Sequence, residues 1–496
     1  MEVELKLALQ RDGLEEIKEK VIPKLNGQST YSSQAIANEY FDTPELLLHA
    51  RKMGFRIRTQ DGICEQTIKT EGLVQGGLHQ RPEYNVGLDK PVPDLTKFDR
   101  DIFAENFDLE YINRHLVMVF TTHFHRHQWH VEFDDGVVEF VYDQGEIKSN
   151  QDVIEINEIE LELKSGKPSI LHEIADVIAE HLAVRLSNIS KAVSGYRLVK
   201  DAPFKTKSLP MFLPLENNLT TEQGLISAIN CGFDHWLYHQ DAYLQCHDSR
   251  ALYQIRESLL LLLYSVALYL PVLQSEELLA LHKQLLKLTQ RWHWTEQLMI
   301  IRRLRSKKGA FCKRVPKESG IMNYLLGRRE GLLQAQLPDS LISQKDAIKV
   351  QLSLSRIVQE KPWRVQNSGA DILVRKHANG WLSQTWQSVV QSLPSSRAMD
   401  ANQYLGIEVL LHQSLMHGFL LGDLFTETRG SFRAPWLDLL DGIHELKALH
   451  LLQAEQQEFE IDEPNQFKEW LNEKQDMLLK VMEMSREAAM RADTYW

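Results

Sequence analysis

Two short segments of this chain alternate charged and apolar residues with a period of two. One is Glu2-Val3-Glu4-Leu5-Lys6, and the other runs from Glu158 to Lys164 as Glu-Ile-Glu-Leu-Glu-Leu-Lys. This alternation is typical of an antiparallel strand with one packed face and one polar face. Because each polar face carries mainly one sign of charge, we expect these strands to line an enclosed charged space and not to face bulk solvent.

A third alternating segment carries the opposite charge. It is Phe55-Arg56-Ile57-Arg58, with two guanidinium groups on one face. Carboxylates that face guanidinium groups across an enclosed sheet would hold a divalent cation and a polyanion together. The pattern therefore predicts a metal-dependent enzyme that acts on phosphates.

Length and charge narrow the class of protein. With 496 residues, 43% of them hydrophobic, the chain is long enough for two or more globular domains. Its net charge of -12 argues against broad electrostatic attraction to nucleic acid or to an anionic membrane. We therefore expect neither as a partner, and any anion site must be a local basic pocket.

The sequence favours a reducing, cytoplasmic location. Four scattered cysteines form no Cys-x-x-Cys pair, and the N-terminus lacks the pattern of a secretory signal. The most apolar run, residues 259–270, is interrupted by Pro271. We expect this run to be too short to span a bilayer and to form a buried helix of a bundle.

The chain divides into two halves of different character. Residues 1–202 combine short alternating segments with turns such as Asp61-Gly62, and helical spacing appears at 12–25 and 169–183. A proline-containing linker is expected at 203–219. Long amphipathic segments fill residues 220–496. The predicted fold class is α+β, an antiparallel sheet domain followed by an all-helical domain.

The predicted sheet domain contains the residue types that phosphate hydrolysis requires. A metal ion and several cations are needed to offset the charge of a phosphate chain, and Mg²⁺ or Mn²⁺ prefers carboxylate oxygens. The candidate carboxylates are Glu2, Glu4, Asp143, Glu160 and Glu162. The candidate phosphate-binding cations are Arg56, Arg58, Lys69, Arg126 and Lys191. A water held between the metal and a carboxylate would attack the phosphate.

Lys6 shares a strand face with Glu2 and Glu4. It could orient the attacking water or lower its pKa, and an ion pair with Glu4 would give the same sequence pattern. We group it with Glu2 and Glu4 as a candidate catalytic residue and leave these roles open.

These residues resemble the CYTH group of triphosphate tunnel metalloenzymes, whose hallmark is an N-terminal Glu-x-Glu-x-Lys. The following matching segments occur in the order of that family: 40–43, Arg56-x-Arg58, 67–69, 76–85, 143–145, Glu160-x-Glu162 and 190–192. They cover about the first two hundred residues. With its helical second half, the chain looks like the CYTH-CHAD proteins of bacteria, and most like their inorganic triphosphatases.

The resemblance implies a closed eight-stranded antiparallel tunnel with the charged residues inside. It implies metal and water binding by the five carboxylates and triphosphate binding by the five cations, with Glu83 at a further acidic position among the substrate-binding residues. The sequence departs from the family at Phe124, where many relatives carry a second basic residue two positions before the arginine that Arg126 matches. The affinity for the substrate, or the preferred substrate, could therefore differ from that of those relatives.

The helical half shows few of the residues through which CHAD domains bind polyphosphate. A basic patch at 302–308 is better explained as a solvated helix end, and polyphosphate binding there is the weaker alternative.

The predicted function is hydrolysis of inorganic triphosphate to diphosphate and phosphate with Mg²⁺ or Mn²⁺. The alternatives are a thiamine triphosphatase, a class IV-type adenylate cyclase, or a polyphosphate-binding module. The sequence leaves the oligomeric state and the role of the helical half open.

Overall fold

The computed structural model describes the whole chain except residues 1, 61, 367–368, 395–396 and 426–427. The chain forms two compact units. The first comprises Met1–Lys205 and Ile342–Glu360, and the second comprises Thr206–Leu341 and Lys361–Trp496. Residues 203–219 contain neither helix nor strand.

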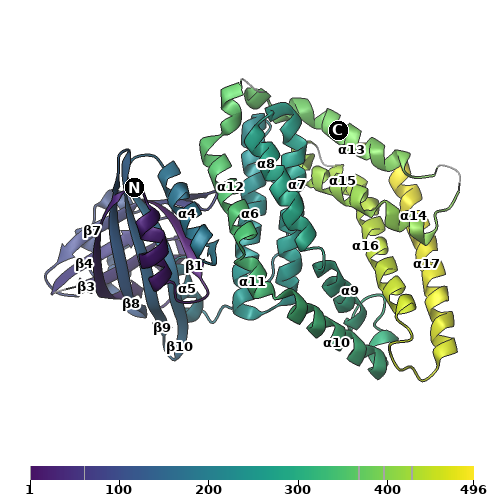
Figure 1. Cartoon of the computed structure of the whole chain (residues 1–496), viewed down its shortest axis with the longest axis horizontal. Coiled ribbons are helices and arrows are strands. Elements are labelled where there is room, and N and C mark those ends of the chain that lie inside the picture. Colours follow the sequence, from purple (N-terminus) through teal and green to yellow (C-terminus); the bar gives the residue numbers. More distant parts are fainter. Residues whose placement is uncertain (1, 61, 367–368, 395–396, 426–427) are drawn as a thin grey trace. The chain divides into compact units, whose positions relative to one another are not determined.

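The first unit is built around one curled antiparallel sheet (Figure 1). Its strands are β1 (Glu2–Leu9), β2 (Gln28–Asp42), β3 (Gly54–Gln60), β4 (Ile63–Lys69), β5 (Leu73–Gln75), β6 (Leu78–Arg81), β7 (Glu83–Leu88), β8 (Val117–Phe133), β9 (Gly136–Ser149), β10 (Asp152–Ser165) and β11 (Val184–Leu186). The predicted α+β class is confirmed.

Helices of the first unit cover the sheet. They are α1 (Leu14–Glu16), α2 (Leu47–Ala50), α3 (Leu109–Arg114), α4 (Ser169–His181), α5 (Lys191–Val199) and α12 (Lys345–Glu360). The predicted helix at 169–183 is α4, which packs on β9 and β10 and buries Ile174 and Ile178. Leu5 and Leu7 of β1 are fully buried, so the odd-numbered residues of this strand form its packed face.

The strand order does not confirm an eight-stranded barrel closed by one continuous ladder. Among the described residues the sheet has eleven strands, with the path β5-β6-β1-β10-β9-β8-β2-β3-β4-β7 and β11 paired to β1. Only Pro82 separates β6, which pairs with β1, from β7, which pairs with β4. Because proline has no N–H to donate, the ladder is interrupted there, and the chain passes directly from β6, which lies next to the edge strand β5, to the opposite edge strand β7.

Helix α12 belongs to the first unit although its sequence lies within the predicted helical half. Its apolar face, with Ile348 and Leu352, is buried. The Gln351 side chain accepts a hydrogen bond from the backbone N–H of Leu186 (2.9 Å), and Gln359 donates one to the carbonyl of Gln75 (3.1 Å). Amphipathic spacing predicted the helix, but spacing alone does not say which domain an apolar face covers.

A buried histidine joins α12 to α4 and makes the stability of the first unit sensitive to acid. The His172 side chain is fully buried, with Nε2 2.8 Å from Oγ of Ser355. Burial, with a smaller effect of Arg356, lowers the pKa of His172 to about 4. Below the unfolded pKa of about 6.5, the unfolded chain therefore takes up a proton more readily than the folded one. The free energy of unfolding consequently decreases as the pH is lowered.

We expect His172 to cost the folded chain about 2 kcal/mol between pH 6.5 and pH 5. The measurement is thermal unfolding at both pH values for the full chain and for His172→Gln, which keeps a hydrogen-bonding side chain that does not titrate. The melting temperature of the variant should fall less between pH 6.5 and pH 5 than that of the unmodified chain. An equal loss in both proteins would show that His172 does not carry this effect.

The second unit is all helical, as predicted. Its helices are α6 (Thr221–Cys246), α7 (Ser249–Leu273), α8 (Glu276–Arg291), α9 (Thr295–Arg305), α10 (Ser319–Gln336), α11 (Pro338–Ile342, which ends at the boundary), α13 (Val374–Gln391), α14 (Ala401–Gly406), α15 (Glu408–Leu421), α16 (Arg429–Ala454) and α17 (Pro464–Arg491).

The apolar run at 259–270 was expected to be too short for a membrane span, and this expectation was wrong. Helix α7 continues through Pro271 to Leu273, and its 25 residues are long and apolar enough to cross a membrane. Pro271 lies in the last turn, where it has no N–H to donate to the carbonyl of Ala267, and only two more residues of the helix follow it. As predicted, the helix is largely buried, with 67% of its most apolar window inside the protein.

Candidate functional site

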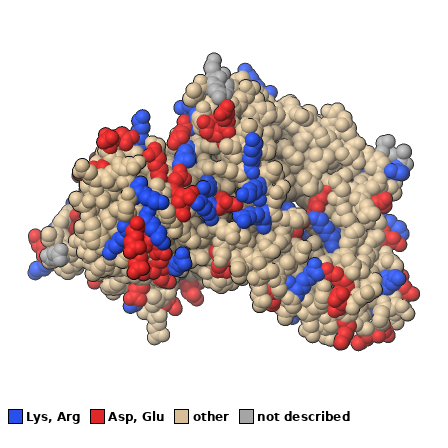
Figure 2. Space-filling view, viewed as in Figure 1, with Lys and Arg blue, Asp and Glu red and all other residues tan. Residues whose placement is uncertain are grey.

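The inner face of the sheet lines a cavity of 730 Å³ in which both signs of charge converge. Nine lysine and arginine side chains and seven glutamates line it. On the face that Figure 2 shows, acidic side chains of the first unit gather in a cluster bordered by lysine and arginine. The residues that the sequence analysis singled out lie in or against this cavity: Glu2, Glu4, Lys6, Arg56, Arg58, Lys69, Glu83, Arg126, Asp143, Glu160, Glu162 and Lys191.

Strand register explains the convergence. On β1 and β10, Glu4 lies opposite Glu162 and Lys6 lies opposite Glu160. On β8 and β9, Arg126 lies opposite Asp143. Directly opposed side chains on one face of a sheet are close neighbours, so a period of two along each strand becomes a block of charge across several strands.

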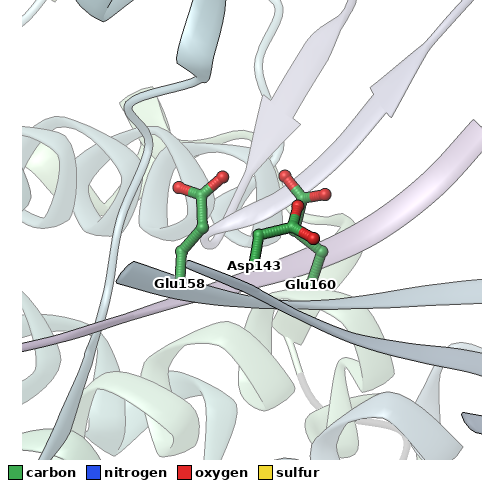
Figure 3. A group of neighbouring side chains, drawn as sticks. All are labelled: Asp143, Glu158 and Glu160. Carbon is green, nitrogen blue, oxygen red and sulfur yellow. The ribbon is translucent and has the colours of Figure 1, made fainter. Parts of the chain in front are cut away.

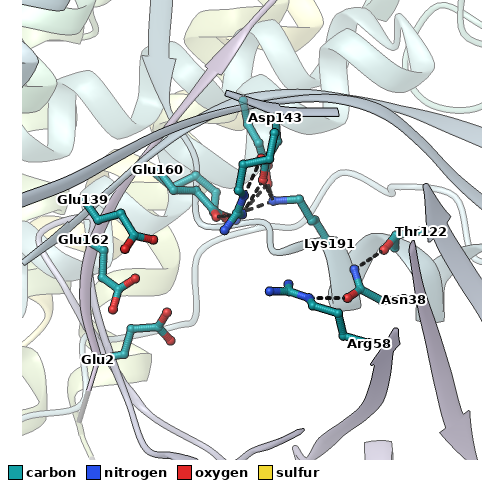
Figure 4. Close-up of polar contacts among 12 residues, drawn as sticks. Glu2, Asn38, Arg58, Thr122, Glu139, Asp143, Glu160, Glu162 and Lys191 are labelled. Carbon is teal, nitrogen blue, oxygen red and sulfur yellow. Dashed lines mark hydrogen bonds and ion pairs between the residues drawn. The ribbon is translucent and has the colours of Figure 1, made fainter. Parts of the chain in front are cut away.

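One wall of the cavity is acidic. Figure 4 shows the carboxylates of Glu2, Glu139 and Glu162 side by side and directed into the open space. Two lysines reach them: Lys69 Nζ lies 2.6 Å from Glu2, and Lys164 Nζ lies 2.7 Å from Glu162 and 3.3 Å from Glu139. Burial raises the pKa of Glu2 to about 7, although Lys69 opposes the shift. Three carboxylates close together and partly desolvated are suited to a divalent cation.

The opposite wall is basic. Arg58 donates from Nε to Oδ1 of Asn38 (2.9 Å), and Asn38 donates to Thr122 (2.8 Å), so the guanidinium is held by neutral groups. Burial, followed by repulsion from Arg56 and Arg126, lowers the pKa of Arg58 to about 10. It therefore remains charged near neutral pH. A cation held by neutral groups and repelled by its neighbours is favourable for binding an anion.

Glu83 neutralises part of the basic wall. Its carboxylate lies 2.7 Å from Lys69 Nζ and 3.8 Å from Arg56. Burial would raise the pKa of Glu83, but Lys69 and Arg56 outweigh it and lower the pKa to about 2. Glu83 is thus a charged partner of two candidate phosphate-binding residues.

The inner end of the cavity holds a compact ionic cluster. Arg126 binds Asp143 through two contacts, Nε to Oδ1 at 2.8 Å and Nη2 to Oδ2 at 2.6 Å. Lys191 Nζ lies 2.7 Å from Asp143 and 3.2 Å from Glu160. Lys6, whose side chain is almost fully buried, lies 2.5 Å from Glu160 and 3.2 Å from Glu158. Lys6 thus forms its ion pairs with β10, because register places it opposite Glu160.

Carboxylate oxygens of Asp143, Glu158 and Glu160 all lie within 4.8 Å of one another, a spacing that could hold a metal ion (Figure 3). In this structure their oxygens are paired with Arg126, Lys191 and Lys6. A divalent ion would have to compete with three cations there, whereas at the acidic wall it would meet only two lysines. Electrostatics therefore favours the acidic wall for a metal ion.

Phe124 is directed into the cavity and packs against two of its cations. Its ring centre lies 5.6 Å from the Arg126 guanidinium carbon and 5.1 Å from Lys191 Nζ. The aromatic ring thus takes the place of a further charge and holds the two cations by cation–π attraction.

Sequence reasoning missed Glu139, Glu158 and Asn38. Glu139 lies opposite Glu162, and Glu158 lies opposite Asp143. The period of two was a sufficient signal for both, since Glu139 shares a face with Asp143 and Glu158 shares one with Glu160. Asn38 could not be found in this way because a neutral amide on a strand carries no such pattern.

A second cavity, of 1230 Å³, lies within the helical unit. Part of the basic patch expected to be a solvated helix end lines it, including Arg302, Arg303 and Arg305. Several of its cations are paired with carboxylates: Arg303 lies 2.5 Å from Asp441, and Lys447 lies 2.5 Å from Glu408. A polyanion entering this cavity would have to displace these carboxylates.

Comparison with known proteins identifies the first unit. Residues 1–196 match the model of the CYTH domain. An inorganic triphosphatase of Haemophilus influenzae is 35% identical over 202 residues, which are 40% of this chain and 54% of that protein. The chain therefore spans about half the length of this curated relative. Residues 1–196 of the chain belong to the CYTH domain family.

Two solved structures are also similar to parts of the chain. A Hippeastrum protein, described as having a dominant triphosphatase activity, is 16% identical with a TM-score of 0.30, covering 41% of this chain and 98% of its own. The CHAD domain of a Ricinus communis protein is 13% identical with a TM-score of 0.43, covering 59% of this chain and 98% of its own.

Proposed function

We propose that the first unit hydrolyses inorganic triphosphate to diphosphate and phosphate with the help of Mg²⁺ or Mn²⁺. The observation that carries the proposal is the meeting of an acidic wall and a basic wall in one 730 Å³ cavity. The similar protein of H. influenzae is named an inorganic triphosphatase, which supports the same activity here. We further infer that the sheet acts as a closed eight-stranded tunnel, with β6 and β7 serving as one strand bent at Pro82.

The acidic wall provides the oxygen ligands for the metal ion. Glu2, Glu4, Glu139 and Glu162 would hold it, with Glu160 and Asp143 at the inner edge of this set. When bound, the ion would polarise a phosphoryl oxygen and lower the pKa of a water molecule. A carboxylate of this wall would accept the proton that the attacking water loses.

The cations would hold the substrate and neutralise charge that develops on the leaving diphosphate. Arg56, Arg58 and Lys69 face the cavity from β3 and β4, while Arg126 and Lys191 face it from β8 and the start of α5. Arginine offers paired N–H groups that match two phosphate oxygens, so the basic wall can fix the orientation of the chain of phosphates. Such positioning supplies much of the acceleration in phosphoryl transfer.

The helical unit is proposed to be an accessory, CHAD-like domain. Carboxylates that pair with cations in its cavity do not favour polyphosphate as its main ligand. Thiamine triphosphate and ATP are the competing substrates for the sheet domain.

The test is release of phosphate by the purified full chain from triphosphate, ATP, thiamine triphosphate and long-chain polyphosphate, each with and without Mg²⁺. Triphosphate with Mg²⁺ should give the highest kcat/KM. The matched variants are Glu162→Gln, in the acidic wall, and Glu155→Gln, an exposed residue of the same strand whose odd number places it on the opposite face. Only the first should lose activity. A preference for ATP or polyphosphate, or full activity of Glu162→Gln, would contradict the proposal.

A further inference from the structure

Glu158 links two lysines from different elements at the inner end of the cavity. Its Oε1 atom contacts Nζ of Lys6 at 3.2 Å and also contacts Nζ of Lys191. The Oε1 atom of Glu160 contacts the same two ammonium groups, at 2.5 Å and 3.2 Å. The two ammonium groups and the two carboxylate oxygens therefore alternate in a four-membered ring of ion pairs. This ring holds the positive charge of Lys6, from β1, close to that of Lys191, from α5.

The register of β1 and β10 makes this bridge possible. Ala8, and not a large residue, lies directly opposite Glu158, while Lys6 lies opposite Glu160. Lys6 and Glu158 are thus diagonal neighbours, a separation that long side chains can reach across a sheet. The side chains of Lys6, Lys191 and Glu158 are only 2%, 9% and 13% exposed, so water screens the bridge weakly.

The cluster balances its charges without a metal ion. Arg126, Lys6 and Lys191 supply three positive charges, and Asp143, Glu158 and Glu160 supply three negative ones. Removing the Glu158 carboxylate would leave one surplus positive charge, with Glu160 as the one carboxylate of the cluster that still contacts both ammonium groups and Asp143 still in contact with Lys191. These groups would then repel each other and lose their fixed positions.

We propose that Glu158 is a positioning residue that fixes the ammonium groups of Lys6 and Lys191 so that both meet the phosphate chain at the inner end of the cavity. This inference rests on the proposed triphosphatase function. Glu158 acts through the two lysines and is not itself a ligand of substrate or metal. Its contribution is therefore to the geometry of the reacting complex and not to the strength of binding.

The variant Glu158→Gln separates positioning from the other roles that a carboxylate could have here. The amide keeps the size of the side chain but cannot neutralise two ammonium groups. We expect kcat for triphosphate to fall about 10- to 100-fold, as for a displacement of reacting groups by about 1 Å. KM should stay equal or fall, because the cavity gains one positive charge. The affinity for Mn²⁺, measured from the electron paramagnetic resonance signal of the free ion, should not change.

Two further variants serve as controls. Glu155→Gln changes an exposed residue on the opposite face of the same strand and should behave as the unmodified chain in all three measurements. Glu158→Asp keeps the charge on a shorter side chain and should recover part of the kcat that Glu158→Gln loses. Thermal unfolding of each variant shows whether it is folded at the assay temperature.

The outcomes distinguish this inference from the proposed function. If the unmodified chain does not hydrolyse triphosphate, the proposed function fails. If it is active and Glu158→Gln matches Glu155→Gln in kcat, Glu158 has no positioning role. A Mn²⁺ affinity that falls tenfold or more in a folded Glu158→Gln protein would instead make Glu158 a metal ligand and overturn the inference.

Discussion

Removal of divalent cations should lower the rate of triphosphate hydrolysis by the full chain by more than about a thousandfold. A bound metal ion stabilises the transition state by several kcal/mol, and each 1.36 kcal/mol is a factor of ten in rate. In this cavity a second cause acts in the same direction. Without the ion, the carboxylates of Glu2, Glu139 and Glu162 face the substrate and repel its negative charge.

The measurement is the initial rate after treatment with a chelator, followed by titration with Mg²⁺ or Mn²⁺. Addition of the ion should restore the full rate, which shows that the chelator did not unfold the protein. As a matched control, Glu162→Gln should need a higher Mg²⁺ concentration for half-maximal rate than Glu155→Gln does. Hydrolysis that continues at the full rate in chelator would contradict a metal-dependent mechanism.

Replacement of Arg126 by methionine should impair both substrate binding and stability. Arg126 is 14% exposed and makes two contacts with Asp143, which is fully buried. Removing one partner of a buried ion pair leaves an uncompensated charge, at a cost of about 3–5 kcal/mol. Lys191 remains 2.7 Å from Asp143, so we expect a loss near the lower end of that range. The lost phosphate contacts should raise KM for triphosphate about 10- to 100-fold.

The double variant Arg126→Met/Asp143→Asn separates these two effects. Because it removes both charges, the buried carboxylate is no longer left unpaired, and the protein should unfold at a higher temperature than Arg126→Met alone. Its KM should nevertheless stay high, since no guanidinium is present to bind phosphate. If the double variant recovered the KM of the unmodified chain, Arg126 would affect the site only through Asp143.

Period-two charge patterns were sufficient to predict the sheet domain and most of its cavity. Glu2, Glu4 and Lys6, together with Glu160 and Glu162, had to share faces of strands, and the register confirms their proximity. The pattern could not predict which carboxylate pairs with which cation, because that depends on register and on long side chains crossing between strands. Lys6 illustrates this, since its ion pairs are with Glu160 and Glu158 of another strand.

Other features depended on tertiary packing. The sequence of α12 predicts an amphipathic helix. Its place in the first unit depends on which surface its apolar face packs against, and the sequence of the helix alone does not specify that surface. The interruption at Pro82 is visible in the sequence as a residue that cannot donate to a ladder. That the strand before Pro82 pairs with β1 and the strand after it pairs with β4 is a property of the whole fold.

The most direct test of the account is a crystal structure of the full chain with Mn²⁺ and a slowly hydrolysed triphosphate analogue, in which anomalous scattering locates the ion. We expect the ion at the acidic wall formed by Glu2, Glu139 and Glu162, with the phosphates between it and Arg56, Arg58 and Arg126. An ion bound among Asp143, Glu158 and Glu160 in place of the lysines, or a triphosphate in the cavity of the helical unit, would contradict the account.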